Sequence, residues 1–109
     1  MTLIRDSKWA GLLRDGRLEE FNRLAGQTPP ELANTDLRML DLRKADLSRA
    51  DLRGAYLRNA DLRGLDLTFA HLEGVSMHDA NVAGVFFPAN VSAEEILLSL
   101  THGTRIRLR

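Results

Sequence analysis

Apolar residues recur at every fifth position through the middle of the chain, from Thr35 to Phe87. The central residues of the eleven units are Leu37, Leu42, Leu47, Leu52, Leu57, Leu62, Leu67, Leu72, Met77, Val82 and Phe87. An α-helix turns about 100° per residue, so this period would spread the leucines around its circumference. A straight strand would send successive leucines to opposite faces. All of them can share one core only if the chain turns a corner in every unit, which predicts a β-solenoid.

The residue two places after each central residue supports such corners. Glycine and asparagine tolerate the positive φ of the third position of a type II turn, and they stand there as Gly54, Asn59, Gly64, Gly74 and Gly84. Lys44, Arg49 and Phe69 occupy the same position elsewhere, and we expect another turn type there because a bulky residue is strained at positive φ. Pro88, directly after Phe87, suits the second position of such a turn.

Most units place alanine and then aspartate before the central leucine, as in residues 45–47 and 60–62. These units resemble the A(D/N)LXX pattern of the pentapeptide repeat family, over about half of the chain. The resemblance implies a mainly β fold, a right-handed quadrilateral β-helix of about three coils with four repeats in each. The central residue and the small residue two places before it would point inward.

The same resemblance implies that residues twenty positions apart stack in columns. The expected columns are Leu37, Leu57 and Met77; Leu42, Leu62 and Val82; Leu47, Leu67 and Phe87; and Leu52 with Leu72. Larger residues replace the inward alanine at Leu40, Leu65, Val75 and Val85, and we expect local widening there.

Residues 7–25 have the pattern of a helix that begins at Ser7 as N-cap and ends near Gly26. Its apolar face holds Trp9, Leu12, Leu13, Leu18, Phe21 and Leu24. Gly16 interrupts the pattern, so two short helices joined at residues 15–16 are the alternative. We expect Trp9 and Phe21 to pack on the first coil, with contact to a partner as the alternative.

The segment 27–34 contains two prolines, which end a helix, and Leu32 stands five residues before Leu37 as a degenerate twelfth unit. The open ends of a solenoid expose unpaired backbone and apolar side chains, so both ends need caps. We expect one domain over 1–109, made of an N-terminal helical cap (1–28), the solenoid (29–91) and a C-terminal helix with a basic tail (92–109).

After Pro88 the five-residue register breaks. Ser92 and Glu95 form a capping box, which predicts a helix from about 93 to 102 that ends at Gly103 and buries Ile96, Leu97 and Leu100. The tail 104–109 alternates like an exposed or edge strand with one basic face. It is either a solubilising tail or a strand that pairs with another chain, so the C-terminal helix or tail is a candidate homodimer contact.

Composition limits the kinds of site and partner that the protein can have. The 109 residues include no cysteine, which removes disulfides and thiolate metal sites, and 15 basic residues balance 15 acidic ones. A balanced charge provides no global attraction to nucleic acid or an anionic membrane. Arg5, Asp6, Lys8, Arg14 and Asp15 interrupt residues 1–25, so we expect no signal peptide, no membrane association and a cytoplasmic location.

Catalytic motifs are missing from the sequence, and we expect no enzyme, no cofactor and no metal. His71 would lie above Asp51 as a surface pair. Asp41, Asp61 and Asn81 would form a column, but a flat ladder lacks the cup of oxygens that a metal ion needs.

Charge is the more informative feature. In most units an aspartate precedes the leucine and an arginine follows it, so the arginine lies two residues from an aspartate of its own unit. Arg58 is the exception, because Tyr56 stands in place of the aspartate. Stacking would place Arg38 under Arg58 and Arg43 under Arg63. The candidate interaction surface consists of Arg38, Arg43, Arg58, Arg63, Asp41, Asp61, Arg105 and Arg107. A merely solvated face is the alternative.

We therefore expect a non-enzymatic protein–protein interaction module with a rigid, charge-patterned solenoid surface. The alternative is a DNA mimic that regulates or protects DNA gyrase, as some pentapeptide repeat proteins do, although those have a strongly acidic surface. Direct binding of nucleic acid is disfavoured, because aspartates flank the arginines and the aromatic residues expected outside are limited to Tyr56 and Phe69.

Overall fold

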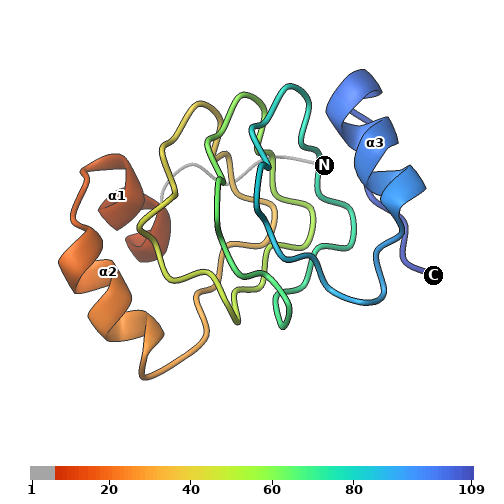
Figure 1. Cartoon of the computed structure of the whole chain (residues 1–109). Coiled ribbons are helices and arrows are strands. Elements are labelled where there is room, and N and C mark those ends of the chain that lie inside the picture. Colours follow the sequence, from red (N-terminus) through yellow and green to blue (C-terminus); the bar gives the residue numbers. More distant parts are fainter. Residues whose placement is uncertain (1–6) are drawn as a thin grey trace.

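The computed structural model describes residues 7–109, and the part of the expected N-terminal cap that falls on residues 1–6 lies outside the described residues. Within these residues three helices, α1 (Lys8–Arg14), α2 (Leu18–Ala25) and α3 (Ala93–His102), flank a repeat region, residues 31–87. Helices α1 and α2 lie at one end of the repeat region and α3 at the other (Figure 1). The repeat region therefore lies between two helical segments.

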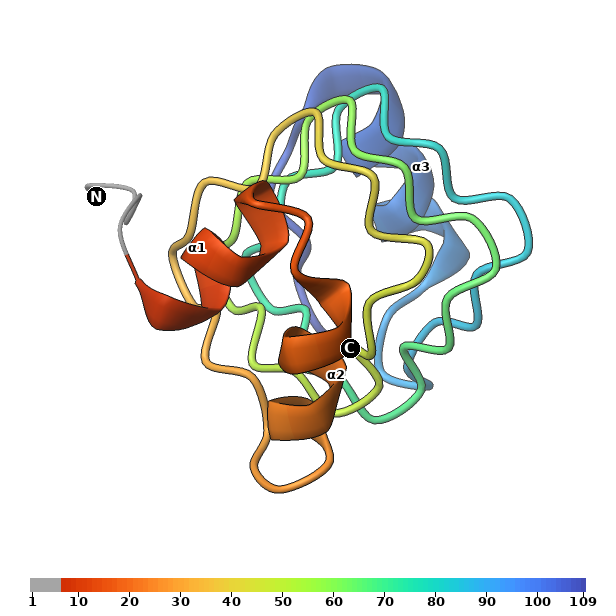
Figure 2. The ribbon, with the colours of Figure 1, turned by 90° about the vertical axis from the view of Figure 1, so that its left-hand side faces the viewer.

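In the repeat region, the chain winds into coils in which residues twenty positions apart are neighbours. The Leu37 N–H donates to the Tyr56 carbonyl and the Tyr56 N–H donates to the Thr35 carbonyl, both at 2.9 Å. The same bond recurs one coil later between the Leu57 N–H and the Ser76 carbonyl, at 2.8 Å. Seen end-on, successive coils superpose with a roughly four-cornered outline (Figure 2). Four five-residue units thus complete one coil, as the resemblance implies.

Each unit forms one side of a coil. Units that stack on one another belong to the same side, and the four sides are numbered first to fourth. The first side holds residues 35–39, 55–59 and 75–79; the second holds 40–44, 60–64 and 80–84; the third holds 45–49, 65–69 and 85–89; the fourth holds 30–34, 50–54 and 70–74. Neighbouring coils meet through single parallel bridges such as Asp41 with Asp61, and no longer strand forms within residues 7–109. A five-residue side leaves too few residues between its corners for a strand.

The corners follow the turn chemistry read from the sequence. All five of the glycine and asparagine corners named above have positive φ, between 58° at Asn59 and 77° at Gly74. Lys44, Arg49 and Phe69 are not among the residues with positive φ, as expected. The corners Asn34, Met39 and Asp79 also have positive φ, at 55°, 62° and 59°. Met39 is unexpected, because a residue with an unbranched apolar side chain is strained at positive φ, whereas asparagine and aspartate tolerate it.

One corner does not match the corner stacked on it. Lys44 lies below Gly64, whose φ is +74°, whereas Lys44 has no positive φ. On the third side, which follows this corner, the first and second coils share no bridge among the described residues. Leu65, one of the four residues at which we expect widening, lies above Ala45 next to this missing bridge. At Leu40, Val75 and Val85 the bridge to the neighbouring coil is intact.

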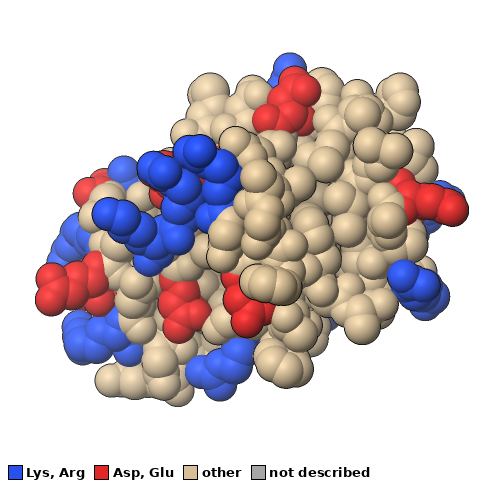
Figure 3. Space-filling view, viewed as in Figure 1, with Lys and Arg blue, Asp and Glu red and all other residues tan. Residues whose placement is uncertain are grey.

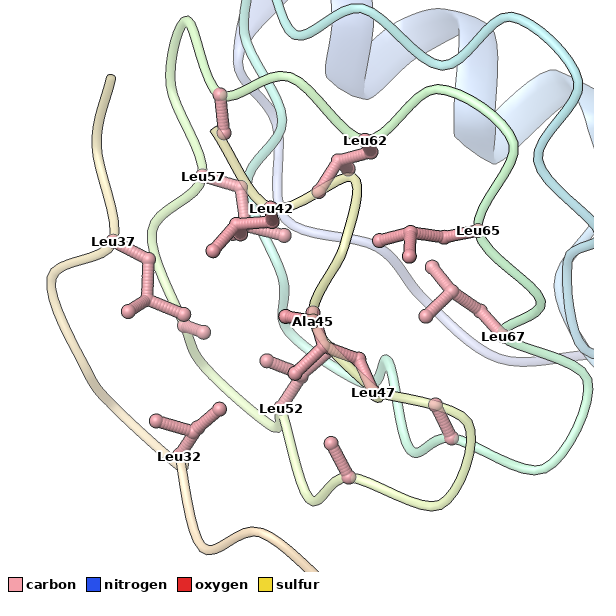
Figure 4. Packing of buried hydrophobic residues seen from close by; sticks show 14 of the residues in the cluster. Leu32, Leu37, Leu42, Ala45, Leu47, Leu52, Leu57, Leu62, Leu65 and Leu67 are labelled. Atoms are coloured by element: carbon pink, nitrogen blue, oxygen red, sulfur yellow. The ribbon is translucent and has the colours of Figure 1, made fainter. Parts of the chain in front are cut away.

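The central apolar residues fill the interior of the repeat region. Figure 4 shows them pointing into the shared space between the four sides. Every central residue from Leu32 to Met77 is at most 2% exposed, and burial of each stabilises the fold by about 1.5–3 kcal/mol. Leu32 is fully buried and Glu31 bridges to Asp51, which confirms the twelfth unit. Val82 and Phe87 are only partly buried, because no fourth coil covers them.

The N-terminal cap consists of two helices, so the alternative with a break near Gly16 is confirmed; Gly16 has φ 70°. The Ser7 hydroxyl accepts from the Ala10 N–H at 3.0 Å, as an N-cap should. Phe21 is fully buried, and the Trp9 ring meets it edge-to-face with centroids 5.3 Å apart. Both aromatic residues thus serve packing within the cap.

Asn22 on α2 joins the cap to the open edge of the first coil. Its amide Nδ2 donates to the Lys44 carbonyl at 2.9 Å, and its Oδ1 accepts from the Asp46 N–H at 2.7 Å. One side chain thereby supplies the donor and the acceptor that a preceding coil would have supplied. Arg14 acts similarly on the first side, where Nη2 donates to the Asp36 carbonyl at 2.9 Å.

The C-terminal cap begins where the corner shifts by one residue. Within the repeats the corner bond joins a central residue to the third residue after it, as from the Ala60 N–H to the Leu57 carbonyl, whereas here the Val91 N–H donates to Pro88 at 3.1 Å. Pro88 therefore takes the first position of its turn, and the predicted second position is wrong. The Ser92 hydroxyl accepts from the Glu95 N–H at 3.2 Å, which confirms that half of the capping box.

The other half of the capping box is wrong, because the Glu95 carboxylate binds Arg107. The tail, expected as an exposed or edge strand, runs along the edge of the repeat region and is not freely exposed. The Gly74 N–H donates to the Ile106 carbonyl at 2.8 Å, the Ile106 N–H donates to the Val75 carbonyl at 2.9 Å, and Ile106 is 2% exposed. The tail thus pairs with the third coil of its own chain. Leu97, expected to be buried, is 62% exposed.

Candidate interaction surface

Aspartate and arginine side chains of the same unit clamp each other on the outside of the repeat region. Asp41 Oδ1 accepts from the backbone N–H of Arg43 at 3.1 Å and from its Nε at 2.9 Å, while Oδ2 accepts from Nη2 at 2.7 Å. The two side chains share one face because the leucine between them points inward. The same clamp joins Asp36 with Arg38, Asp51 with Arg53 and Asp61 with Arg63. We call these four pairs the Asp–Arg ladder.

The ladder also connects neighbouring coils, and its arginines favour the ionised form of its aspartates. Arg43 Nε lies 3.4 Å from Asp61 Oδ2 of the next coil. Hydrogen bonds from the Arg43 side chain and backbone hold the pKa of Asp41 well below its usual range, and the Arg53 and Arg63 side chains lower the pKa of Asp51 and Asp61. The predicted local pairing is thus confirmed, and the arginine columns are largely neutralised by it.

Arg58 differs from the four clamped arginines. Tyr56 takes the aspartate position of its unit, and no ion pair to Arg58 is formed within residues 7–109. Below it, the Arg38 guanidinium lies 5.4 Å from the centroid of the Tyr56 ring, a cation–π contact. The stacking of Arg38 under Arg58 is as predicted, and the Met39 N–H donates to the Arg58 carbonyl at 2.9 Å. Arg58 therefore lacks the carboxylate partner that Arg38, Arg43, Arg53 and Arg63 each have in their own unit.

Arg105 and Arg107 do not join the ladder. Arg105 Nη1 donates to the carbonyls of Gly74 at 2.7 Å and Gly54 at 3.2 Å, at a corner of the fourth side. Arg107 binds the Glu95 carboxylate through Nε and Nη2, at 3.2 and 2.8 Å. Both arginines fasten the tail to the rest of the molecule. The sequence does not reveal these partners, since they lie far from the tail along the chain.

Histidine and carboxylate columns form as expected, without converging. Asp51 and His71 are bridge partners in neighbouring coils, while the Asp51 carboxylate binds Arg53. Asp41, Asp61 and Asn81 are stacked on the second side. Within the described residues, no group of three or more histidines and carboxylates is arranged to hold a metal ion.

The third side differs from the other three. Its aspartates, Asp46 and Asp66, accept from Ser48 and Thr68 in place of arginine. Two large apolar residues beside them are open to solvent, since Phe69 is 74% exposed and Phe86 is 66% exposed. Phe86 stands at the position that aspartate holds in most units, which is the sequence feature by which its exposure could have been foreseen.

Charged side chains are distributed unevenly over the surface. In the view of Figure 3 they gather on the half that carries α1, α2 and the first coils, whereas the half with the third coil and α3 is mostly uncharged. Residues 64–104 contain no lysine or arginine, and their charged residues are the acidic Asp66, Glu73, Asp79, Glu94 and Glu95. The ladder is therefore confined to the first two coils.

A chain of five-residue units that stack at twenty-residue spacing, with paired charges outside, defines a repeat protein of the pentapeptide type. A family model, Pentapeptide repeats, matches in eight copies over residues 31–64 and 50–87, which together make up more than half of the chain. The chain belongs to the pentapeptide repeat family. Searches of curated proteins and of solved structures gave no match. In residues 7–109, no helix has the length and apolar character of a membrane span.

Proposed function

We propose that the protein is a non-enzymatic protein-binding module whose repeat region presents a rigid, charge-patterned surface to another protein. We also infer that the repeat region is a right-handed quadrilateral β-helix, the fold that the family resemblance implies, and the parallel bridges at twenty-residue spacing support this. The observation that carries the functional proposal is the Asp–Arg ladder. Its side chains are held before any partner arrives, so little conformational entropy is lost on binding.

The clamped arginines keep donors for a partner. The guanidinium group has five N–H donors, and in each clamp the aspartate engages Nε and Nη2 while Nη1 stays open. The planar group thus presents further N–H donors to carbonyl or carboxylate acceptors of a protein surface. Arg58 adds a charge that no residue of 7–109 neutralises. These features favour a polar partner surface with some excess of acidic groups.

The proposal assigns no catalytic role and no cofactor. A general base that works at neutral pH needs a pKa raised toward 7. The aspartates of the ladder have lowered pKa values, because arginine side chains donate to them. Such carboxylates support binding better than proton transfer.

The alternative, a DNA mimic that acts on DNA gyrase, is the weaker candidate. A mimic of the DNA backbone needs rows of uncompensated negative charge, whereas Asp36, Asp41, Asp51 and Asp61 each hold an arginine. A supercoiling assay tests this alternative, and we expect neither inhibition of gyrase nor protection from a quinolone at micromolar protein.

The main test compares partners retained by immobilised wild-type chain and by the Arg43→Glu/Arg63→Glu variant. We expect the variant to lose a partner that the wild type binds, because two guanidinium groups at the centre of the surface are reversed in charge. Lys8→Glu/Arg23→Glu, on the N-terminal helices, is the charge-matched control and should keep the partner. Retention by the ladder variant, with unchanged thermal melting, would contradict the assignment of this surface.

A further inference from the structure

The third side carries a second candidate surface, which we call the aromatic face: Asp66, Thr68, Phe69, Phe86 and Pro88. It lies on a different side of the coil from the surface in the proposed function and depends on different residues. Phe69 and Phe86 are among the most exposed large apolar side chains of residues 7–109. Exposed aromatic residues close together on a surface are typical of protein-binding sites.

The backbone places Asp66 directly beside Phe86. The two residues are parallel bridge partners in neighbouring coils, and the Phe86 N–H donates to the Leu65 carbonyl at 2.9 Å. Phe69 stands at the corner that ends the same side. A hollow of 310 Å³ adjoins these residues, lined by Thr68, Phe69, Ala70, His71, Pro88, Ala89 and Asn90. An anion, two exposed rings and a recess are thus combined on one side of the repeat region.

The Asp66 carboxylate is held but not neutralised. Thr68 donates to Oδ1 from its N–H at 3.0 Å and from its hydroxyl at 2.6 Å, and no hydrogen bond to Oδ2 forms within the described residues. These bonds lower the pKa of Asp66, so the group is anionic at neutral pH. No lysine or arginine occurs between Arg63 and Arg105, and no ion pair to Asp66 forms within residues 7–109. A cation that pairs with Asp66 would therefore come from outside this part of the chain.

We propose that the aromatic face binds a basic segment of another protein, in which an arginine side chain meets Asp66 Oδ2 and lies against the exposed rings. Guanidinium groups combine a bidentate match to carboxylate with favourable stacking on aromatic faces. Aliphatic side chains next to the arginine would cover Phe69, Phe86 and the adjoining hollow. In a second copy of the chain the ladder arginines are clamped and Arg105 and Arg107 fasten the tail, so the arginine would have to come from outside these sets, as at Arg58, and the sedimentation measurement below distinguishes that source.

The probe for the test is a short capped peptide of alternating arginine and leucine, titrated into the ¹⁵N-labelled full chain and followed by NMR. We expect amide shifts concentrated in 65–70 and 85–90, and no binding of a matched peptide with glutamate in place of arginine. Asp66→Asn and Phe69→Ala/Phe86→Ala should each weaken binding by about tenfold or more. The side chains replaced are exposed, so thermal melting should change little.

Two matched controls locate the effect. Asp51→Asn removes an aspartate from the same position of another side, and Leu97→Ala removes an exposed apolar side chain from α3. Both should bind the peptide like the wild type. The proposal is overturned if the peptide does not bind at millimolar concentration, if the glutamate peptide binds equally, or if Asp51→Asn weakens binding as much as Asp66→Asn. It is also overturned if sedimentation gives a dimer that Phe69→Ala/Phe86→Ala dissociates.

Discussion

A corner of the repeat region requires a particular backbone conformation of one residue. Where φ is positive, between 55° and 77° at eight corners, glycine has no Cβ to strain and asparagine tolerates the conformation. Met39 has φ 62° and a side chain that is 75% exposed. It thus carries the strain of this conformation without compensating burial.

Met39→Gly should therefore raise the free energy of unfolding by about 0.5–1 kcal/mol, because relief of strain exceeds the added entropy of the unfolded chain. Urea denaturation measures the change. Met39→Ala retains a Cβ and should leave the stability close to that of the wild type. A loss of stability in the glycine variant would show that the Met39 side chain makes contacts that offset the strain.

Gly64→Ala is the opposite substitution at an equivalent corner. Gly64 has φ +74°, and a Cβ added there meets no atom within 4 Å, so the effect is backbone strain alone. We expect a loss of about 1–2 kcal/mol in the free energy of unfolding, measured in the same urea experiment. An unchanged stability would mean that the corner does not hold positive φ in solution.

The ladder aspartates make stability depend on acid. Asp41, Asp51 and Asp61 have lowered pKa values in the folded state, so the unfolded chain binds more protons as pH falls. Their contribution is present above the unfolded pKa of about 4 and is lost as pH falls through the lower folded values. We expect the urea midpoint to drop between about pH 5 and pH 2.

The Arg43→Gln/Arg63→Gln variant separates the ladder from the other carboxylates. It removes the donors that lower these pKa values, so its midpoint should fall less steeply with acid. Lys8→Gln/Lys44→Gln removes the same charge without touching a clamp and should keep the wild-type slope. Equal slopes in all three proteins would contradict the role of the clamps.

At the scale of elements, side chains of the caps replace the neighbour that an end coil lacks. Asn22 of α2 satisfies Lys44 and Asp46 at one end. At the other end, the Ser99 hydroxyl of α3 accepts from the Met77 N–H at 2.9 Å, and Ser99 is fully buried. The caps are therefore joined to the repeat region by specific hydrogen bonds as well as by apolar packing.

Ser99→Ala should lower the free energy of unfolding by about 1–3 kcal/mol, because the buried Met77 N–H would lose its acceptor. Thr101→Ala on the same helix is the control. Thr101 is exposed and its hydroxyl donates to Leu97 of its own helix, so we expect a change within about 0.5 kcal/mol. Similar effects in both variants would indicate a general loss of helix stability.

Sequence reasoning was accurate for features that each unit repeats. The inward leucines, the corner glycines and the aspartate–arginine pairs all depend on residues within one unit, so the five-residue period predicts them. The attachment of the caps depends on single residues such as Asn22, Ser99 and Ile106, whose partners lie more than twenty residues away in sequence. No periodicity encodes those contacts, and for this reason the sequence does not predict which edge the tail follows.

At the scale of the whole molecule, charge divides the surface into two parts. The first two coils carry the ladder, whereas residues 64–104 contain no lysine or arginine. The sequence predicted the ladder half of the candidate surface because its pairs are local. The sequence analysis does not include Phe86, although its place at the outward aspartate position of the unit indicates that it is exposed.

The central claim is that a corner in every fifth residue brings residues twenty positions apart into contact around a shared apolar interior. Nuclear Overhauser effects on the labelled full chain measure this directly. We predict contacts between residues such as Leu57 and Met77, and between Leu42 and Leu62, together with slow amide exchange at the hydrogen bond from Leu57 to Ser76. Sequential helical contacts through 35–87, or the absence of contacts at twenty-residue spacing, would contradict the account.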